Sequence, residues 1–471
     1  MPAALARIYS GVTGLACGIA WFDRLGGRTA AVVLAAGAAG LALRRRPVAA
    51  CASIACIAAG LGAVGAEARE ARMRPLARLA ERVPHCRLVG SVVEHMGGLG
   101  TLIAVDAADC GRGGRLRAAG TVAADLPRAD SGASLEAQGW LVPLGTSGFD
   151  LARRRLGAAA SLRISDAQIG EVSSAPARLA ATVRSGLRAA TARLPPDRGA
   201  LIRGLAVGDT GGMSASAEAD LRRAGLSHLV AVSGSNVAIV LGTIGLAARR
   251  LGLRARIALG ALGLAGFVLV VGPEPSVLRA AAMGGIGLAA LALGRRADPL
   301  FGLGLALIVV IGTRPGMLFS VGLQLSAAAT AGIVLWARPL AGAFRRLPAV
   351  VAVPLAVTIA AQVAVAPLLA LIFGEVSVVA PAANLLAAPV VPWATVAGLG
   401  AGIAAAAAPS AGRLVAELAS PAAGWVLSVS DLLGGAPWAS AAPPRWAGWG
   451  LAAIVCAGAA VTLSRIARLA P

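Results

Sequence analysis

The chain contains no lysine and is poor in charged and aromatic side chains. Charged residues make up 14% of its 471 residues and aromatic residues 3%, whereas 57% are hydrophobic. This composition is too apolar for one water-soluble core, so most of the apolar surface must face lipid or other buried helices. The sequence therefore predicts a mainly α-helical, multi-pass membrane protein.

The residue patterns that many enzymes need are also missing. The three histidines, His85, His95 and His228, form no metal-ligand pattern, and neither HExxH nor HxHxDH occurs. No glycine-rich nucleotide loop ends in lysine, and Ser233 lacks the strand-to-helix context of a nucleophile elbow. We therefore expect no catalytic residue, no metal and no cofactor, and predict that the chain is not an enzyme.

Long apolar runs divide the chain into four parts. A membrane span needs about 20 mostly apolar residues, and roughly 10–12 candidates occur, three before residue 70 and the rest after 226. The first run is interpreted as a retained span, because further spans follow at once and no small-residue cleavage signal stands out. The predicted parts are transmembrane helices at 1–66, an extracytoplasmic β domain at 67–175, amphipathic surface helices at 176–225 and a second transmembrane domain at 226–471.

Arginine positions predict how the chain crosses the membrane. The net charge of +21 would attract nucleic acid or anionic lipid, but the enrichment of basic residues in cytoplasmic loops explains it as well. Two candidate spans separate each pair of consecutive arginine clusters, so all six clusters can be cytoplasmic. Both termini are then cytoplasmic and residues 67–200 lie outside the plasma membrane. The clusters are Arg44–Arg46, Arg249–Arg256, Arg295–Arg296, Arg338–Arg346, Arg413 and Arg465–Arg468.

The polar insert is predicted to form a small β-barrel of the OB type. Only Trp140 and Phe149 supply Phe, Trp or Tyr rings between residues 70 and 200, so the insert is either a platform for single-stranded nucleic acid or a folded spacer or docking module. Cys86 and Cys110 both lie in this outward-facing insert, where a disulfide is one of two alternatives. Turn residues separate five β-type stretches, at 87–94, 100–105, 116–123, 134–144 and 160–164.

Helix signals follow the insert. Residues 176–203 have an amphipathic pattern that Pro195 interrupts, and we expect this segment on the outer membrane surface. Caps at both ends predict a helix at about 215–224. Prolines interrupt the apolar stretch 376–403, which is typical of a broken or re-entrant helix.

Polar side chains recur near the outer ends of four spans that descend from outside. Such groups are costly in hydrocarbon and normally face a bundle interior or a water-filled cavity, so the coincidence of depth favours a shared vestibule. Each residue alone also has a structural explanation, and bracing and channel roles are equally open for Asp209. The candidates are Asp209, His228, Ser233, Gly234, Ser235, Asn236, Glu274, Arg279, Gln324, Ser326 and Asn384.

The string GLAVGDTGGMSASAEADLRRAGLSHLVAVSGSNV at 204–237 resembles the competence region of the ComEC family of DNA-uptake channels. A Gly-Asp element, an amphipathic helix and GLSHLxAxSG occur there in the same order. Residues 275–296, 314–335 and 381–393 resemble later motifs of that family. Residues 145–157 are similar to part of its OB-like domain.

The resemblance implies a channel that carries single-stranded DNA across the cytoplasmic membrane during natural transformation. The implied partners are DNA, membrane lipids, an extracytoplasmic DNA receptor and a cytoplasmic ATPase. Two positions depart from the family. Asn236 stands where histidine is frequent, and the sequence stops at Pro471 where many members continue into a metallo-β-lactamase-like domain, so a separate nuclease is expected.

Two other functions fit the sequence. A small-molecule or lipid permease agrees with broken, glycine-rich helices, although no convincing internal repeat occurs. A membrane scaffold for DNA-uptake components would need only the external domain for docking. The sequence does not indicate an oligomeric state.

Overall fold

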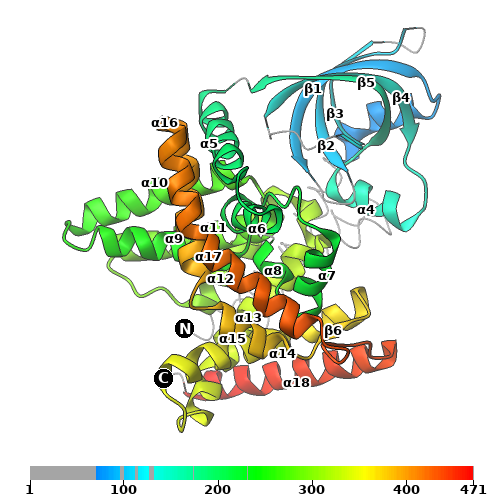
Figure 1. The fold of residues 1–471 in the computed structure, drawn as a ribbon. Coiled ribbons are helices and arrows are strands. Elements are labelled where there is room, and N and C mark those ends of the chain that lie inside the picture. The colour runs from blue at the N-terminus through cyan, green and yellow to red at the C-terminus, as the bar shows by residue number, and fades with distance from the viewer. Residues whose placement is uncertain are drawn as a thin grey trace. The chain divides into compact units, whose positions relative to one another are not determined.

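The computed structural model describes residues 70–95, 100–111, 115–126, 132–172, 174–230 and 232–469. The three spans predicted before residue 70 lie outside these ranges. The described residues divide into two compact units: a helical unit within 182–306 and 322–469, and a barrel unit within 70–181 and 307–321. Figure 1 shows the elements of both units.

Five strands form a closed barrel in the order β1-β2-β3-β5-β4. The pair β3 and β5 is parallel, and the other neighbours are antiparallel. Each predicted stretch corresponds to one strand, which confirms a five-stranded barrel, while its assignment to the OB type stays a prediction. The helix α4, Gly148–Leu156, lies between the last two strands. The strands are β1 His85–His95, β2 Thr101–Asp109, β3 Arg115–Ala124, β4 Ala133–Pro143 and β5 Ala160–Val172.

Alternation of side chains builds the barrel interior. Successive residues of a strand point to opposite faces, and β4 accordingly alternates between buried and more exposed positions. Leu88, Ile103, Leu135 and Leu141 are almost fully buried and belong to one core cluster. A disulfide joins Cys86 to Cys110, with their Cα atoms 4.0 Å apart. It ties the start of β1 to the residue after β2.

The other elements are helices and two short strands. They are α5 Ala175–Thr191, α6 Pro196–Val207, α7 Ala215–Arg223, α8 Ser227–Val230, α9 Gly234–Ala247, α10 Leu253–Val271, α11 Pro275–Ala292, α12 Pro299–Thr313, the 3-10 helix η3 Pro315–Phe319, α13 Val321–Ala343, α14 Ala349–Ile372, β6 Val376–Ser377, α15 Ala380–Ala387, α16 Val391–Ala407, α17 Pro409–Gly434, β7 Ser440–Ala441 and α18 Arg445–Leu469. The helix predicted at 215–224 is α7. The Ser214 hydroxyl accepts a hydrogen bond from the backbone N–H of Ala217, at 3.3 Å, as expected for an N-cap.

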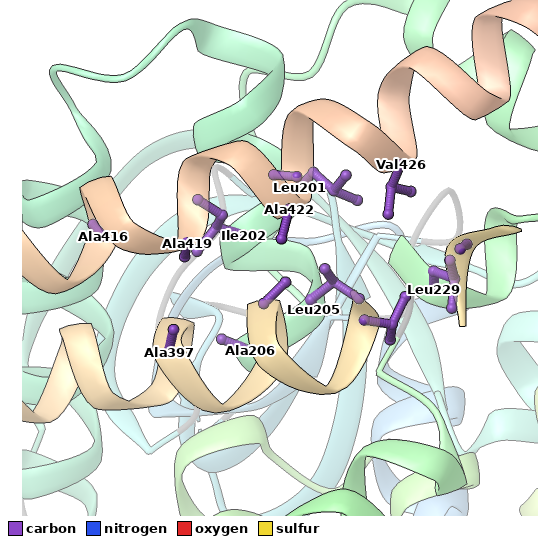
Figure 2. Close-up of a cluster of buried hydrophobic side chains, with 14 of the residues drawn as sticks. Leu201, Ile202, Leu205, Ala206, Leu229, Ala397, Ala416, Ala419, Ala422 and Val426 are labelled. Carbon is purple, nitrogen blue, oxygen red and sulfur yellow. The ribbon is translucent and has the colours of Figure 1, made fainter. Parts of the chain in front are cut away.

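The helix α6 lies in the interior of the helical unit, which corrects the prediction of surface helices throughout 176–225. Leu201, Ile202 and Leu205 have no exposed surface. They pack between α16 and α17, as Figure 2 shows. Small residues on those helices allow the close approach: Gly398 lies against Ile202, where an added Cβ would sit 3.1 Å from its Cγ2 atom. The apolar residues of α6 therefore contact protein.

Four helices in the described part of the chain are long and apolar enough to cross a membrane: α10, α11, α13 and α14. The helices α15 and α16 together make a fifth candidate, bent by 55° at the predicted break. The sequence predicted seven or more spans after residue 226, but only these five candidates in the described part of the chain are both long and apolar enough. The apolar helices α9 and α12 have only 14 and 15 residues. The 26-residue α17 also carries Arg413, Glu417 and Asp431.

Candidate functional site

The first turn of α9 is electropositive. Its N-cap, Ser233, has an extended backbone and makes no side-chain capping bond, and no acidic residue occurs in the first turn. A helix N-terminus carries about half a positive charge on its unsatisfied N–H groups. Because α9, α10 and α11 pack against one another, this end of α9 lies among helices of the same unit.

Arg279 in α11 faces the start of α9. The residue is only 5% exposed. The Nε atom donates to the Ser326 hydroxyl of α13 at 2.9 Å, and one terminal nitrogen contacts the sulfur of Met283 at 3.1 Å. Among the residues that the structure describes, no carboxylate forms an ion pair with Arg279. It is therefore a buried cation held by a hydroxyl and a thioether.

Gly234 leaves space for the side chain of Arg279. A Cβ atom at residue 234 would collide with the guanidinium of Arg279 and would sit 3.3 Å from the Cβ atom of Ala280. Glycine at this position therefore lets α9 approach α11 closely and leaves the arginine its room.

Asn236 anchors the same turn to α6. The residue is fully buried, and its Nδ2 atom donates to the carbonyl oxygen of Leu205 at 2.9 Å. Its Oδ1 atom accepts from the hydroxyls of Ser233 and Ser235 at 3.4 and 3.5 Å. We call the six residues Ser233, Gly234, Ser235, Asn236, Arg279 and Ser326 the Arg279 cluster.

Asp209 braces the loop after α6. Its Oδ2 atom accepts from Nε of Arg188 in α5 at 2.7 Å, and its Oδ1 atom accepts from the backbone N–H of Gly211 at 3.1 Å. Arg203 bonds to the carbonyl oxygen of Gly211 and to the hydroxyl of Thr191, the latter at 3.0 Å. Of the two roles left open for Asp209, these contacts with α5 and with its own loop support bracing.

His228 and Asn384 bond within their own segments. A ring nitrogen of His228 lies 3.1 Å from the carbonyl oxygen of Gly225, and Asn384 donates to the carbonyl oxygen of Ala380 at 2.9 Å. Glu274 is the exposed N-cap of α11, and Gln324 is half-buried in the first turn of α13. A vestibule shared by all four helices therefore stays a prediction.

Sequence reasoning missed several residues that hold these candidates. Met283 is four residues after Arg279, so helical spacing could have identified it. Ser276, three residues before Arg279, donates to the carbonyl oxygen of Val232 at 2.6 Å. Arg188 and Arg203 gave no local signal, since their contacts depend on how α5 packs beside the loop after α6. In the described ranges, no group of three or more His, Cys, Asp and Glu side chains could hold a metal ion.

Comparison with known proteins places most of the helical unit in one family. The family model described as Competence protein matches residues 205–468 of this chain. ComE operon protein 3 of Bacillus subtilis (strain 168) is 30% identical over 213 residues, which cover 45% of this chain and 27% of that relative. No solved structure matches. Because the match covers more than half of its residues and includes the whole Arg279 cluster, the chain belongs to the Competence protein family.

Proposed function

We propose that this chain forms a conduit for single-stranded DNA across the cytoplasmic membrane during natural transformation. Membership of the Competence family supports a role in DNA uptake. The observation that carries the finer proposal is Arg279, a buried cation with no carboxylate partner among the described residues. An ionisable residue inside a membrane helix is expensive and is typically functional.

A DNA phosphate supplies the counter-ion that Arg279 needs. Guanidinium groups bind phosphate with paired N–H donors. The uncapped start of α9, next to Arg279 through Gly234, adds N–H groups that favour an anion. A single arginine with serine hydroxyls holds one phosphate at a time, and weak binding at each step is what conduction requires.

Helix direction supports an extracytoplasmic position for the Arg279 cluster. The Arg279 cluster includes residues of the N-terminal turns of α9 and α11, whereas the arginine pairs Arg249–Arg250 and Arg295–Arg296 come just after the C-terminal ends of these helices. Since such pairs favour the cytoplasmic side, the cluster belongs to the outer half of the membrane. We infer that a receptor delivers the strand there, that a cytoplasmic ATPase or ion gradient drives it, and that a nuclease removes the other strand.

The test is transformation of a naturally competent bacterium whose own Competence-family gene is deleted and replaced by this chain. Arg279→Gln should lower uptake of labelled DNA at least about tenfold, equivalent to about 1.4 kcal/mol, and Arg279→Lys should retain part of it. Arg250→Gln, at an exposed arginine after α9, should have no effect.

Ser326→Ala separates function from folding. It removes only the hydroxyl that orients Arg279, so it should reduce uptake while the amount of protein in the membrane stays at the parental level. Parental uptake by both Arg279→Gln and Ser326→Ala, with normal protein levels, would refute the conduit.

A lipid permease is the second candidate, and one observation favours it. A hollow of about 520 Å³ lies between α10 and α11 and is lined by apolar residues. Such a groove suits an acyl chain. Translocation of labelled lipid in reconstituted vesicles distinguishes the two functions. The permease is favoured if Leu264→Trp, in the hollow, blocks lipid translocation and Arg279→Gln does not.

A further inference from the structure

A single aromatic side chain stands out on the outside of the barrel. Trp140 in β4 is 51% exposed, although its neighbour Leu141 is fully buried in the core. Half of this large apolar ring faces solvent. An exposed indole on a strand is therefore a candidate contact surface for a ligand.

The cross-strand neighbours of Trp140 are polar. Register places His85 of β1 opposite Trp140 on one side and Arg163 of β5 opposite it on the other. The His85 ring meets the indole edge to face, with centroids 5.2 Å apart and an interplanar angle of 81°. The imidazole of His85 also forms a hydrogen bond with the hydroxyl of Ser165 in β5, with Nε2 and Oγ 3.4 Å apart. Trp140, His85 and Arg163 form what we call the Trp140 platform.

The backbone beneath the platform is irregular. A register shift between β4 and β5 falls between Gln138 and Gly139, directly before Trp140. A Cβ atom at Gly139 would collide with the carbonyl oxygen of Arg163, so only glycine allows this approach. Bulges of this kind re-aim side chains and are frequent beside binding sites.

We propose that the Trp140 platform binds a nucleotide of single-stranded DNA before the strand reaches the helices, an inference that rests on the proposed function. A base stacks on the indole, and the adjacent phosphate meets Arg163, which forms no ion pair within the described residues. Duplex DNA cannot stack in this way because its base faces are already covered.

The surrounding charges set the strength of binding. Glu136 pairs with Arg87 on the same barrel face, and Asp166 is exposed opposite Gln138 in β5. These acids leave Arg163 as the cation for one phosphate. Binding is therefore weak and depends little on salt, as suits a site that passes the strand onward. Insertion of Trp140 into a membrane would also bring its polar cross-strand neighbours, His85 and Arg163, toward the lipid.

Fluorescence anisotropy tests the platform with the purified full chain in nanodiscs and a labelled 12-nucleotide oligo(dT). Trp140→Ala should weaken binding about 5- to 150-fold, the range of 1–3 kcal/mol for one stacked base. Trp140→Phe should retain most of the affinity. Arg163→Gln should lower the slope of log K against log salt by about 0.7.

Phe149→Ala is the matched control. Phe149 is an exposed ring of the same unit, 45% exposed, and contacts the guanidinium of Arg153 on α4. It should bind like the parent. An unreactive Cys86–Cys110 pair in each variant reports an intact barrel.

Three results would overturn the platform. Trp140→Ala could bind oligo(dT) as tightly as the parent does. Trp140→Ala could weaken the binding of duplex and of single-stranded DNA equally, or it could weaken binding to protein-free lipid vesicles and leave oligonucleotide binding unchanged. The conduit is judged separately. If Trp140→Ala binds normally and Arg279→Gln abolishes uptake, only the platform fails; if Trp140→Ala loses binding and Arg279→Gln transports normally, only the conduit fails.

Discussion

Replacing Asp209 separates bracing from contact with DNA. The Asp209 side chain is 8% exposed and that of Arg188 is 41% exposed. Breaking a buried pair costs about 3–5 kcal/mol, but water can solvate the half-exposed Arg188, which reduces the cost. We expect Asp209→Asn to lower the free energy of unfolding by about 2 kcal/mol. Asp209→Ala should cost about 1 kcal/mol more, because it also leaves the N–H of Gly211 without its acceptor.

A double-mutant cycle with Arg188→Gln measures the pair directly. Its coupling energy should be about 1 kcal/mol, determined by denaturant unfolding of the purified chain in mild detergent. Arg193→Gln, at an exposed position near the end of the same segment, should change stability by less than about 0.5 kcal/mol. Uptake by the Asp209 variants should fall only as far as the amount of folded protein falls. Zero coupling, or lost uptake at parental stability, would refute the bracing role.

Two further substitutions test the packing around the Arg279 cluster and the helical core. Gly234→Ala should displace the guanidinium of Arg279 from Ser326 and reduce DNA uptake at normal protein level. Gly242→Ala, on the same helix with no atom within 4 Å of the added Cβ, should transport normally and gain about 0.5–1 kcal/mol of stability; equal uptake by both would contradict the steric argument. Thr395→Val should raise the unfolding free energy by about 1 kcal/mol, since the buried Thr395 hydroxyl has no hydrogen-bond partner among the described residues; a lower midpoint of unfolding would show that the hydroxyl is needed.

The barrel was readable from sequence because its signal is local. Each strand alternates inward and outward residues between turns, and each of the five predicted stretches overlaps one strand, although β2 and β5 continue past the predicted ends at 105 and 164. The same holds for α7, whose caps lie within ten residues of each other. The sequence could not decide whether the insert binds single-stranded nucleic acid or serves as a spacer or docking module. It also could not show that Trp140 lies between His85 and Arg163, because strand pairing brings together residues that are 55 and 23 positions apart in the chain.

The helical unit was less predictable because its contacts are distant in sequence. A surface location for α6 followed from an amphipathic pattern read across Pro195, whereas α16 and α17 cover the helix on both sides. Hydropathy identified apolar stretches but not where their helices begin and end. The helices α9 and α12, with 14 and 15 residues, are therefore shorter than the spans that the sequence predicted. Similar depth grouped His228 and Asn384 with Arg279, yet each bonds to a carbonyl three or four residues earlier.

Crosslinking of DNA held in mid-transfer tests the conduit most directly. A diazirine-bearing amino acid replaces the half-buried Ala327, the residue after Ser326 in α13, or, as a control, the 70% exposed Leu262 of α10. Labelled DNA with a bulky protein on its trailing end is then supplied to competent cells and irradiated. The conduit predicts DNA crosslinked at residue 327 and none at residue 262; DNA crosslinked at neither position, while a probe in the barrel captures it, would contradict passage through the helices.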